Sequence, residues 1–394
     1  MRFPEFHGEW EEHGLSEYLD FKNGLNPDSK RFGKGIKFIS VMDILNNPVI
    51  TYDCIRASVQ ATDAEISSFS VENGDILFQR SSETLEDVGR ANVYIDDRVA
   101  LFGGFVIRGK KKANYNPLFF RYLLSSPYAR KRIIPMGAGA QHFNIGQEGL
   151  SKVLLNFPSI EEQTKIASLL HLLDERIATQ SKLIEDLKKL KSAISKLLFT
   201  RKDLLETTIR LADIATLKNG YAFQSSKYNI LGKWKILTIA NVSGERHINE
   251  EDCNCIINLP NDIQDHQVLK EGDILISLTG NVGRVSLCKD GNYLLNQRVG
   301  LLHITKNVNQ EFLYQVLSSR RFENSMLACG QGAAQMNIGK GDVENFVLPY
   351  SSNANNIHLV ARILHSYDKC IINELRELTL LTMQKQYFLA QMFI

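Results

Sequence analysis

The most regular hydrophobic pattern of the chain lies in two long segments, residues 159–200 and 351–394, which contain neither glycine nor proline. In each segment, apolar side chains recur at alternating steps of four and three. Polar residues interrupt both stripes at the same two rungs, Gln180 and Lys191 in the first and Glu374 and Lys385 in the second. Such spacing over several heptads is typical of coiled coils, and two unrelated surface helices would not share the interruptions. The pattern predicts two long helices that pair as a coiled coil.

The order of segments along the chain favours an antiparallel pair. Each helix would be about 60 Å long at the usual rise per residue. Parallel packing would require the second globular half to span that whole length, whereas antiparallel packing would not. We expect Gln180 and Glu374 to meet near the middle of the pair and fix its register, as buried polar rungs can.

The remaining residues have the pattern of mixed α/β domains. Short β-branched or aromatic runs, such as Ile36–Val41 and Lys235–Ile239, predict strands. Residues Leu118–Leu124 and Phe312–Leu317 have helical spacing. The predicted fold class is therefore mixed α and β, with two similar domains held apart by the two long helices.

The chain is also an internal duplication, with a period of about half its length. The glycine-rich stretch Gly137–Gly146 returns as Gly330–Gly339, and the motif at Lys22–Gly24 returns at Lys218–Gly220. This period is far longer than that of a solenoid repeat. The duplication predicts four segments: a first domain at 1–158, a helix at 159–200, a second domain at 201–350 and a helix at 351–394.

Composition narrows the function classes. With 394 residues, 44% of them hydrophobic, the chain can form two cores of ordinary size. No apolar run is long enough to span a bilayer, and the first residues lack a secretory pattern, so we expect a cytoplasmic location. The net charge of +2 does not by itself indicate nucleic acid. The six cysteines show no paired metal spacing, so we expect no metal.

Motifs that suggest an enzyme have simpler explanations. Asn116-Pro117-Leu118-Phe119 resembles the base-binding loop of amino-methyltransferases, but a helix N-cap followed by proline explains it better. Gly339-Lys340-Gly341 lacks the hydroxyl residue and the glycine spacing of a phosphate-binding P-loop. We find no catalytic residues and expect no cofactor in this chain. The glycine-rich stretches permit two interpretations, a cradle for phosphate or base edges and a turn that leads into the long helix.

Four stretches together resemble the specificity subunit of type I restriction–modification systems. They are the opening run Arg2–Glu11, the run Ile214–Phe223, the turn and strand Gly272–Ser277, and the proline-to-helix run Pro158–Ala167. The corresponding second run, Pro349–Asn356, lacks the Glu-Glu-Gln of the first. The resemblance covers the whole chain.

The resemblance implies a non-catalytic DNA-reading subunit. Each domain would read one half of a split, asymmetric site in double-stranded DNA, and the helix pair would set the gap between the halves. Two methylation subunits, which carry S-adenosylmethionine, would dock on the helices, and translocating restriction subunits would join the complex. The alternative is a coiled-coil scaffold that binds proteins and never contacts DNA.

Polar loop residues are the candidates for base contacts. Arginine can bind guanine through two hydrogen bonds, and glutamine or asparagine can bind adenine in the same way. The candidates are Gln79, Arg80, Ser81 and Arg90 in the first domain; Thr279, Asn281, Arg284, Gln297 and Arg298 in the second; and, from the glycine-rich stretches, Gln141, His142, Asn144, Gln335 and Asn337.

Overall fold

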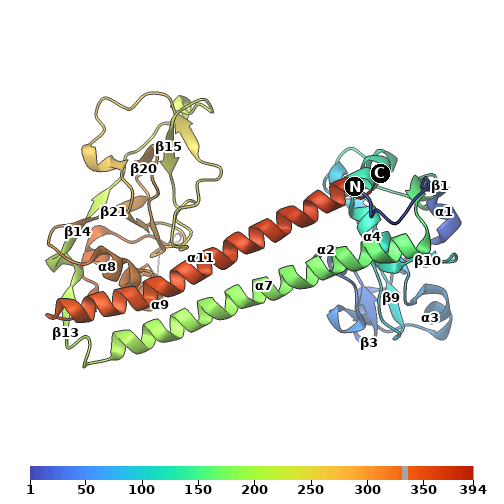
Figure 1. Cartoon of the computed structure of the whole chain (residues 1–394), viewed down its shortest axis with the longest axis horizontal. Helices are drawn as coiled ribbons and strands as arrows, with labels where there is room; N and C mark the ends of the chain where they lie inside the picture. Colours follow the sequence, from blue (N-terminus) through green and yellow to red (C-terminus); the bar gives the residue numbers. More distant parts are fainter. Residues whose placement is uncertain (331–335, 394) are drawn as a thin grey trace. The chain divides into compact units, whose positions relative to one another are not determined.

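A computed structural model of the chain describes residues 1–330 and 336–393 (Figure 1). The chain divides into two compact units. Unit 1 comprises Met1–Ser181 and Arg376–Ile394, and unit 2 comprises Lys182–Leu375. The division falls inside the two long helices, so each unit consists of one globular half with the adjoining part of both helices.

Unit 1 contains short helices and strands followed by the first long helix, α7 (Ile160–Thr200), which continues into unit 2. Its strands are β1 (Glu11–Gly14), β2 (Leu19–Asn23), β3 (Phe32–Ile39), β4 (Ser58–Val59), β5 (Ser70–Val71), β6 (Ile76–Gln79), β7 (Ser81–Ser82), β8 (Ala91–Val93), β9 (Ala100–Phe102), β10 (Val106–Lys111), β11 (Phe143–Asn144) and β12 (Leu154–Phe157). Its other helices are α1 (Leu15–Tyr18), α2 (Val41–Asn46), α3 (Asp63–Phe69), α4 (Pro117–Ser125), α5 (Pro127–Ile133) and α6 (Gln147–Ser151).

Unit 2 leads into the second long helix, α11 (Ala354–Gln391), which ends in unit 1. Its strands are β13 (Thr207–Arg210), β14 (Ala215–Asn219), β15 (Trp234–Leu237), β16 (Asn254–Ile256), β17 (Val268–Leu269), β18 (Ile274–Ser277), β19 (Val285–Leu287), β20 (Tyr293–Leu295), β21 (Val299–Ile304) and β22 (Val347–Tyr350). Its other helices are α8 (Gln310–Leu317), α9 (Arg320–Cys329) and α10 (Lys340–Glu344).

Sheet topology confirms the duplication. Unit 1 has four-stranded sheets of order β2-β10-β6-β8 and β4-β3-β9-β5, and unit 2 has β14-β21-β18-β19 and β16-β15-β20-β17 in the same roles. A two-stranded sheet, β1-β12 or β13-β22, precedes the long helix in each half. The mixed α and β fold with two similar domains is therefore confirmed.

One repeated glycine has a steric explanation. A Cβ atom on Gly24 would lie 2.0 Å from the carbonyl oxygen of Gly103, and a Cβ atom on Gly220 would lie 2.2 Å from that of Asn296. Only glycine permits this approach of two backbones. The glycine of the Lys-Asn-Gly motif therefore recurs because each half brings the residue after β2 or β14 against the same turn.

The long helices bury the apolar stripe that the sequence predicts. In unit 1, Leu170 and Leu173 of α7 belong to one core with Leu381 and Leu389 of α11. In unit 2, Leu198 of α7 packs in one core with residues of α11; these are Ile357, Val360, Ala361 and Leu364.

Within each unit the two helices run antiparallel. In unit 1, Asp174 binds Lys385 while Arg176, further along α7, binds the earlier residue Glu377 of α11 at 2.9 Å. Gln180 belongs to unit 1 and Glu374 to unit 2, so their role in the register stays a prediction.

The enzyme-like motif at Asn116 is a helix cap, as predicted. The Asn116 side chain accepts a hydrogen bond of 3.0 Å from the backbone N–H of Phe119, and Pro117 is the first residue of α4. Asn309 caps α8 in the same way, with 2.8 Å to the N–H of Phe312. In each unit, residues of the capped helix, α4 or α8, share a core with residues of the long helices.

Candidate nucleic-acid interface

In each unit, three loops meet at the end of the central sheet strand, and we call this arrangement the platform. In unit 1 it consists of the loop after β6, the turn Gly103–Val106 and the glycine-rich stretch Ala138–Ile145. Arg80 donates its backbone N–H to the carbonyl oxygen of Phe105 at 2.9 Å, and Ile145 donates to the carbonyl oxygen of Arg80 at 2.9 Å. The loop after β6 is therefore held between the turn and the glycine-rich stretch.

The platform of unit 2 has the same backbone hydrogen bonds. The Leu278 N–H donates to the carbonyl oxygen of Arg298 at 3.0 Å, and the Ile338 N–H donates to that of Leu278 at 2.9 Å. The turns correspond as well, because Val106 N–H bonds to Gly103 at 2.8 Å and Val299 N–H bonds to Asn296 at 2.9 Å. Two sequences with little identity thus build one backbone frame.

On this frame, predicted base-contact residues of the loop after the central strand meet those of the glycine-rich stretch. In unit 1, the Ser81 hydroxyl hydrogen-bonds the side-chain oxygen of Asn144, and β7 pairs with β11 at these residues. In unit 2, the Thr279 hydroxyl lies 3.3 Å from the side-chain oxygen of Asn337, and the two residues form a β-bridge. The sequence predicted these residues separately, and the structure brings them together.

The glycine-rich stretch is more than a connection to the long helix. In unit 1, α6 and β12 stand between it and α7. Gly139 has a φ of +147°, and a Cβ atom there would lie 2.0 Å from the carbonyl oxygen of His142, so the loop needs glycine to close on itself. Whether it cradles a phosphate stays a prediction. Its counterpart in unit 2 includes Gln335, which lies outside the described residues.

Other predicted residues differ in how far they are presented to solvent. Gln79 is only 5% exposed, and its amide donates to the carbonyl oxygen of Ser81 at 2.9 Å, so it lies beneath the loop and supports it. Arg80 is partly exposed and donates to the carbonyl oxygen of Gly104 at 3.3 Å. Arg90 is exposed but forms an ion pair of 2.5 Å with Asp87. The exposed candidates are Gln141, His142, Asn144, Asn281, Gln297, Arg298 and Asn337, with Ser81, Thr279 and Arg284 partly exposed.

A family model decides the assignment of the chain. The model for the type I restriction modification DNA specificity domain matches residues 7–189 and again residues 206–382. The chain belongs to this family of specificity subunits.

Individual relatives are distant but extend over nearly the whole chain. The type I restriction enzyme MjaVIII specificity subunit of Methanocaldococcus jannaschii is 23% identical over 382 residues, which is 88% of this chain and 84% of the relative. The S subunit structure from M. genitalium aligns with a TM-score of 0.60 at 16% identity, covering 100% of this chain and 99% of the other. A chain from a structure described as the basis of complex assembly and conformational transition of the type I R-M system aligns with a TM-score of 0.59 at 15% identity, covering 98% of this chain and 97% of the other.

The specificity subunit also has a second duplicated feature, which the sequence interpretation missed. In each unit, an aspartate of one long helix accepts hydrogen bonds from the other long helix and from the globular half. Asp174 of α7 binds Lys385 of α11, the Arg121 guanidinium at 3.2 Å and the Tyr122 hydroxyl at 2.8 Å. Burial raises the pKa of Asp174, but the hydrogen bonds from Lys385 and Tyr122 outweigh burial, so the pKa lies below its ordinary value.

Asp368 of α11 has the equivalent place in unit 2. It binds Lys191 of α7 at 2.6 Å, the Gln315 amide of α8 at 2.5 Å and the Arg246 guanidinium at 2.9 Å. The polar rungs Lys191 and Lys385 thus each donate to a carboxylate of the opposite helix. Two of the four stripe interruptions, Lys191 and Lys385, are the lysines of these clusters. The repeat of Asp174 as Asp368 was the signal available in the sequence.

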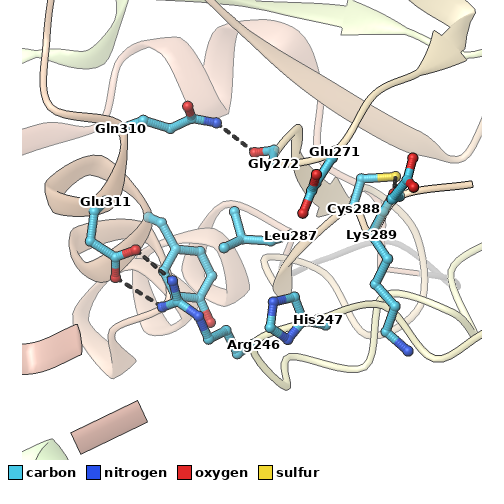
Figure 2. A pocket seen from close by; sticks show the side chains of 11 residues that line it. Arg246, His247, Glu271, Gly272, Leu287, Cys288, Lys289, Gln310 and Glu311 are labelled. Carbon is cyan, nitrogen blue, oxygen red and sulfur yellow. Dashed lines mark hydrogen bonds and ion pairs between the residues drawn. The ribbon is translucent and has the colours of Figure 1, made fainter. Parts of the chain in front are cut away.

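A polar cavity of about 390 Å³ lies beside the Asp368 cluster in unit 2. Figure 2 shows the Arg246 guanidinium paired with both carboxylate oxygens of Glu311, one contact being 2.8 Å, near His247. Burial lowers the pKa of His247, and the positive charges of Arg246 and Lys289 lower it further. Of the described residues that line the cavity, none is a predicted base-contact residue. The cavity is therefore separate from the predicted base-contact residues.

Several site classes find no support in the described part of the specificity subunit. Residues 1–330 and 336–393 contain no cluster of three or more histidine, cysteine or acidic side chains suited to a metal ion. The six cysteines are all unpaired thiols, including Cys253 and Cys255. Over the same described ranges, no helix has the length and apolar character needed to cross a membrane.

Proposed function

We propose that each unit reads one half of a bipartite, asymmetric site in double-stranded DNA through its platform. The carrying observation is that the platforms share their backbone hydrogen bonds and differ in the side chains mounted on them. A fixed frame with exchanged polar side chains suits base readout in the major groove, where donors, acceptors and methyl groups distinguish the four base pairs. A scaffold that binds only proteins has no need for this combination.

The two long helices would fix the gap between the half-sites and dock two methylation subunits. The antiparallel arrangement in each unit and the equivalent clusters around Asp174 and Asp368 support this proposal, because two similar mounts suit two copies of one partner. S-adenosylmethionine would be bound by the methylation subunits, which would flip the target adenine out of the duplex. Restriction subunits would join this complex to cut unmethylated DNA.

The direct test is methylome sequencing of cells that express this chain with its methylation subunit. We expect a new N6-methyladenine motif made of two short halves separated by an unspecified gap of constant length. Cells with the methylation subunit alone are the control and should lack the motif. Absence of any new mark, with the complex assembled and S-adenosylmethionine bound, would contradict the proposal and favour the scaffold.

A further inference from the structure

Phe105 is an exposed aromatic residue on the platform of unit 1. Its side chain is 69% exposed. Of the ring contacts among the described residues, none involves Phe105, although most other phenylalanines of unit 1 are packed in cores or ring pairs. The polar residue Arg80 donates its backbone N–H to the carbonyl oxygen of Phe105. A single exposed apolar residue is common on protein surfaces, so exposure alone does not indicate a function for Phe105. Its position in the turn does.

The backbone that carries Phe105 is held firmly from several directions. Its carbonyl oxygen accepts the 2.9 Å hydrogen bond from the Arg80 N–H, and the Arg80 guanidinium donates to the neighbouring Gly104 carbonyl oxygen at 3.3 Å. Asn26 packs so closely that a Cβ atom on Gly104 would lie 1.8 Å from its side-chain oxygen. The backbone of the turn therefore has little conformational freedom to lose on binding.

The equivalent position in unit 2 is Arg298. Phe105 directly precedes β10, and Arg298 directly precedes the equivalent strand β21. The carbonyl oxygen of each accepts a hydrogen bond from the loop after the central strand, at 2.9 Å and 3.0 Å. Arg298 is exposed and suited to the O6 and N7 atoms of guanine. A phenyl ring in that place offers neither donor nor acceptor. The apolar group that bases present in the major groove is the 5-methyl group of thymine.

We propose that Phe105 reads a thymine in the first half-site through contact with its 5-methyl group. The inference rests on the proposed function and identifies one base and one residue within it. Because the two turns are equivalent, unit 1 would read by apolar contact at the place where unit 2 reads by hydrogen bonding.

The test uses the assembled methyltransferase complex and duplexes that carry its own methylation motif. In competition binding, each thymine of the first half, on either strand, is replaced in turn by deoxyuridine, which removes only the methyl group. We expect one such replacement to weaken binding by the wild-type complex about fourfold, the value of one buried methyl-sized group. Phe105→Ser should bind the thymine and uracil duplexes equally, whereas Phe105→Leu, which keeps an apolar side chain, should retain most of the discrimination.

Leu154→Ala is the matched control, because Leu154 is 49% exposed in unit 1 but lies on β12. It should leave the discrimination unchanged. Indifference of the wild-type complex to uracil at every first-half position overturns the proposal. Equal weakening of thymine and uracil duplexes by Phe105→Ser overturns it too, since the ring would then act as a wedge between base steps. Failure of the proposed function is recognised earlier, because wild-type binding would then not distinguish the motif from a scrambled duplex.

Discussion

The two platforms differ at the side chains that point to solvent and agree in the backbone beneath them. Unit 1 mounts Phe105 where unit 2 mounts Arg298, and the turns below them close with hydrogen bonds of 2.8 Å and 2.9 Å. The loop after the central strand also differs, since in unit 1 it contains a short 3-10 helix, Leu85–Asp87, that unit 2 lacks among its described elements. The two units therefore differ in the side chains that a partner would contact and share the backbone hydrogen bonds of the platform.

The clusters around Asp174 and Asp368, which we call the domain–helix junctions, also combine shared residues with residues that differ between the units. Both have a central aspartate and a lysine from the opposite helix, but Arg121 and Tyr122 complete the cluster in unit 1, whereas Gln315 and Arg246 complete it in unit 2. The Asp368 side chain is 7% exposed and that of Asp174 is 16% exposed. The second junction therefore depends more on its ion pairs.

The largest expected effect is the loss of the junction carboxylate. Asp368→Asn leaves Lys191 and Arg246 without their shared charge partner, and removing one member of a buried pair costs up to about 3–5 kcal/mol. Because the partners are partly exposed, we expect about 2–4 kcal/mol for Asp368→Asn and about half as much for Asp174→Asn. Urea denaturation measures both.

The two tryptophans allow each unit to be followed separately, since Trp10 belongs to unit 1 and Trp234 to unit 2. In variants that keep only Trp234, Asp368→Asn should lower the urea midpoint of unfolding more than Asp174→Asn does. In variants that keep only Trp10, Asp174→Asn should lower that midpoint more. Equal shifts with both probes would mean that the junctions are energetically equivalent or that the units unfold together.

The next effect concerns recognition. Arg298→Ala should cost about 1–3 kcal/mol at one position of the second half-site and leave the first half-site unchanged. Arg80→Ala should act only on the first half-site, partly through the turn that its guanidinium supports. Competition binding with duplexes altered at one base pair at a time measures this. A loss of equal size on every duplex would show that Arg298 contacts phosphate rather than a base.

The sequence predicted features that depend on neighbours along the chain. The 3–4 stripe identified both long helices, and Asn116-Pro117 identified the start of α4, because spacing and caps are local. The burial of Gln79 could not be inferred, since it follows from Arg90 returning to pair with it across the sheet. The equivalence of Phe105 and Arg298 was hidden as well, because Gly103-Gly104-Phe105 shares no residue with Asn296-Gln297-Arg298 and only the fold aligns them.

The smallest effect separates the units by their response to acid. Lys235 of β15 binds Glu250 at 2.7 Å, whereas the corresponding Lys37 of β3 binds the carbonyl oxygen of Ile55 at 2.7 Å. Hydrogen bonds from Lys235 and Tyr293 lower the pKa of Glu250 from its ordinary 4.5 to about 2. The stabilisation from Glu250 is therefore complete above about pH 4.5 and is lost as the pH falls toward 2.

Because the pair is more than one-third exposed, solvent screening keeps this contribution below about 1 kcal/mol. Glu250→Gln should lower the stability of unit 2, followed through Trp234, at pH 7, and the difference from wild type should shrink between pH 4.5 and pH 3. Lys37→Met, the matched change in unit 1 followed through Trp10, should show no such pH dependence, since its partner is a carbonyl group. A difference for Glu250→Gln that persists unchanged at pH 3 would mean that the charge of Glu250 does not stabilise unit 2.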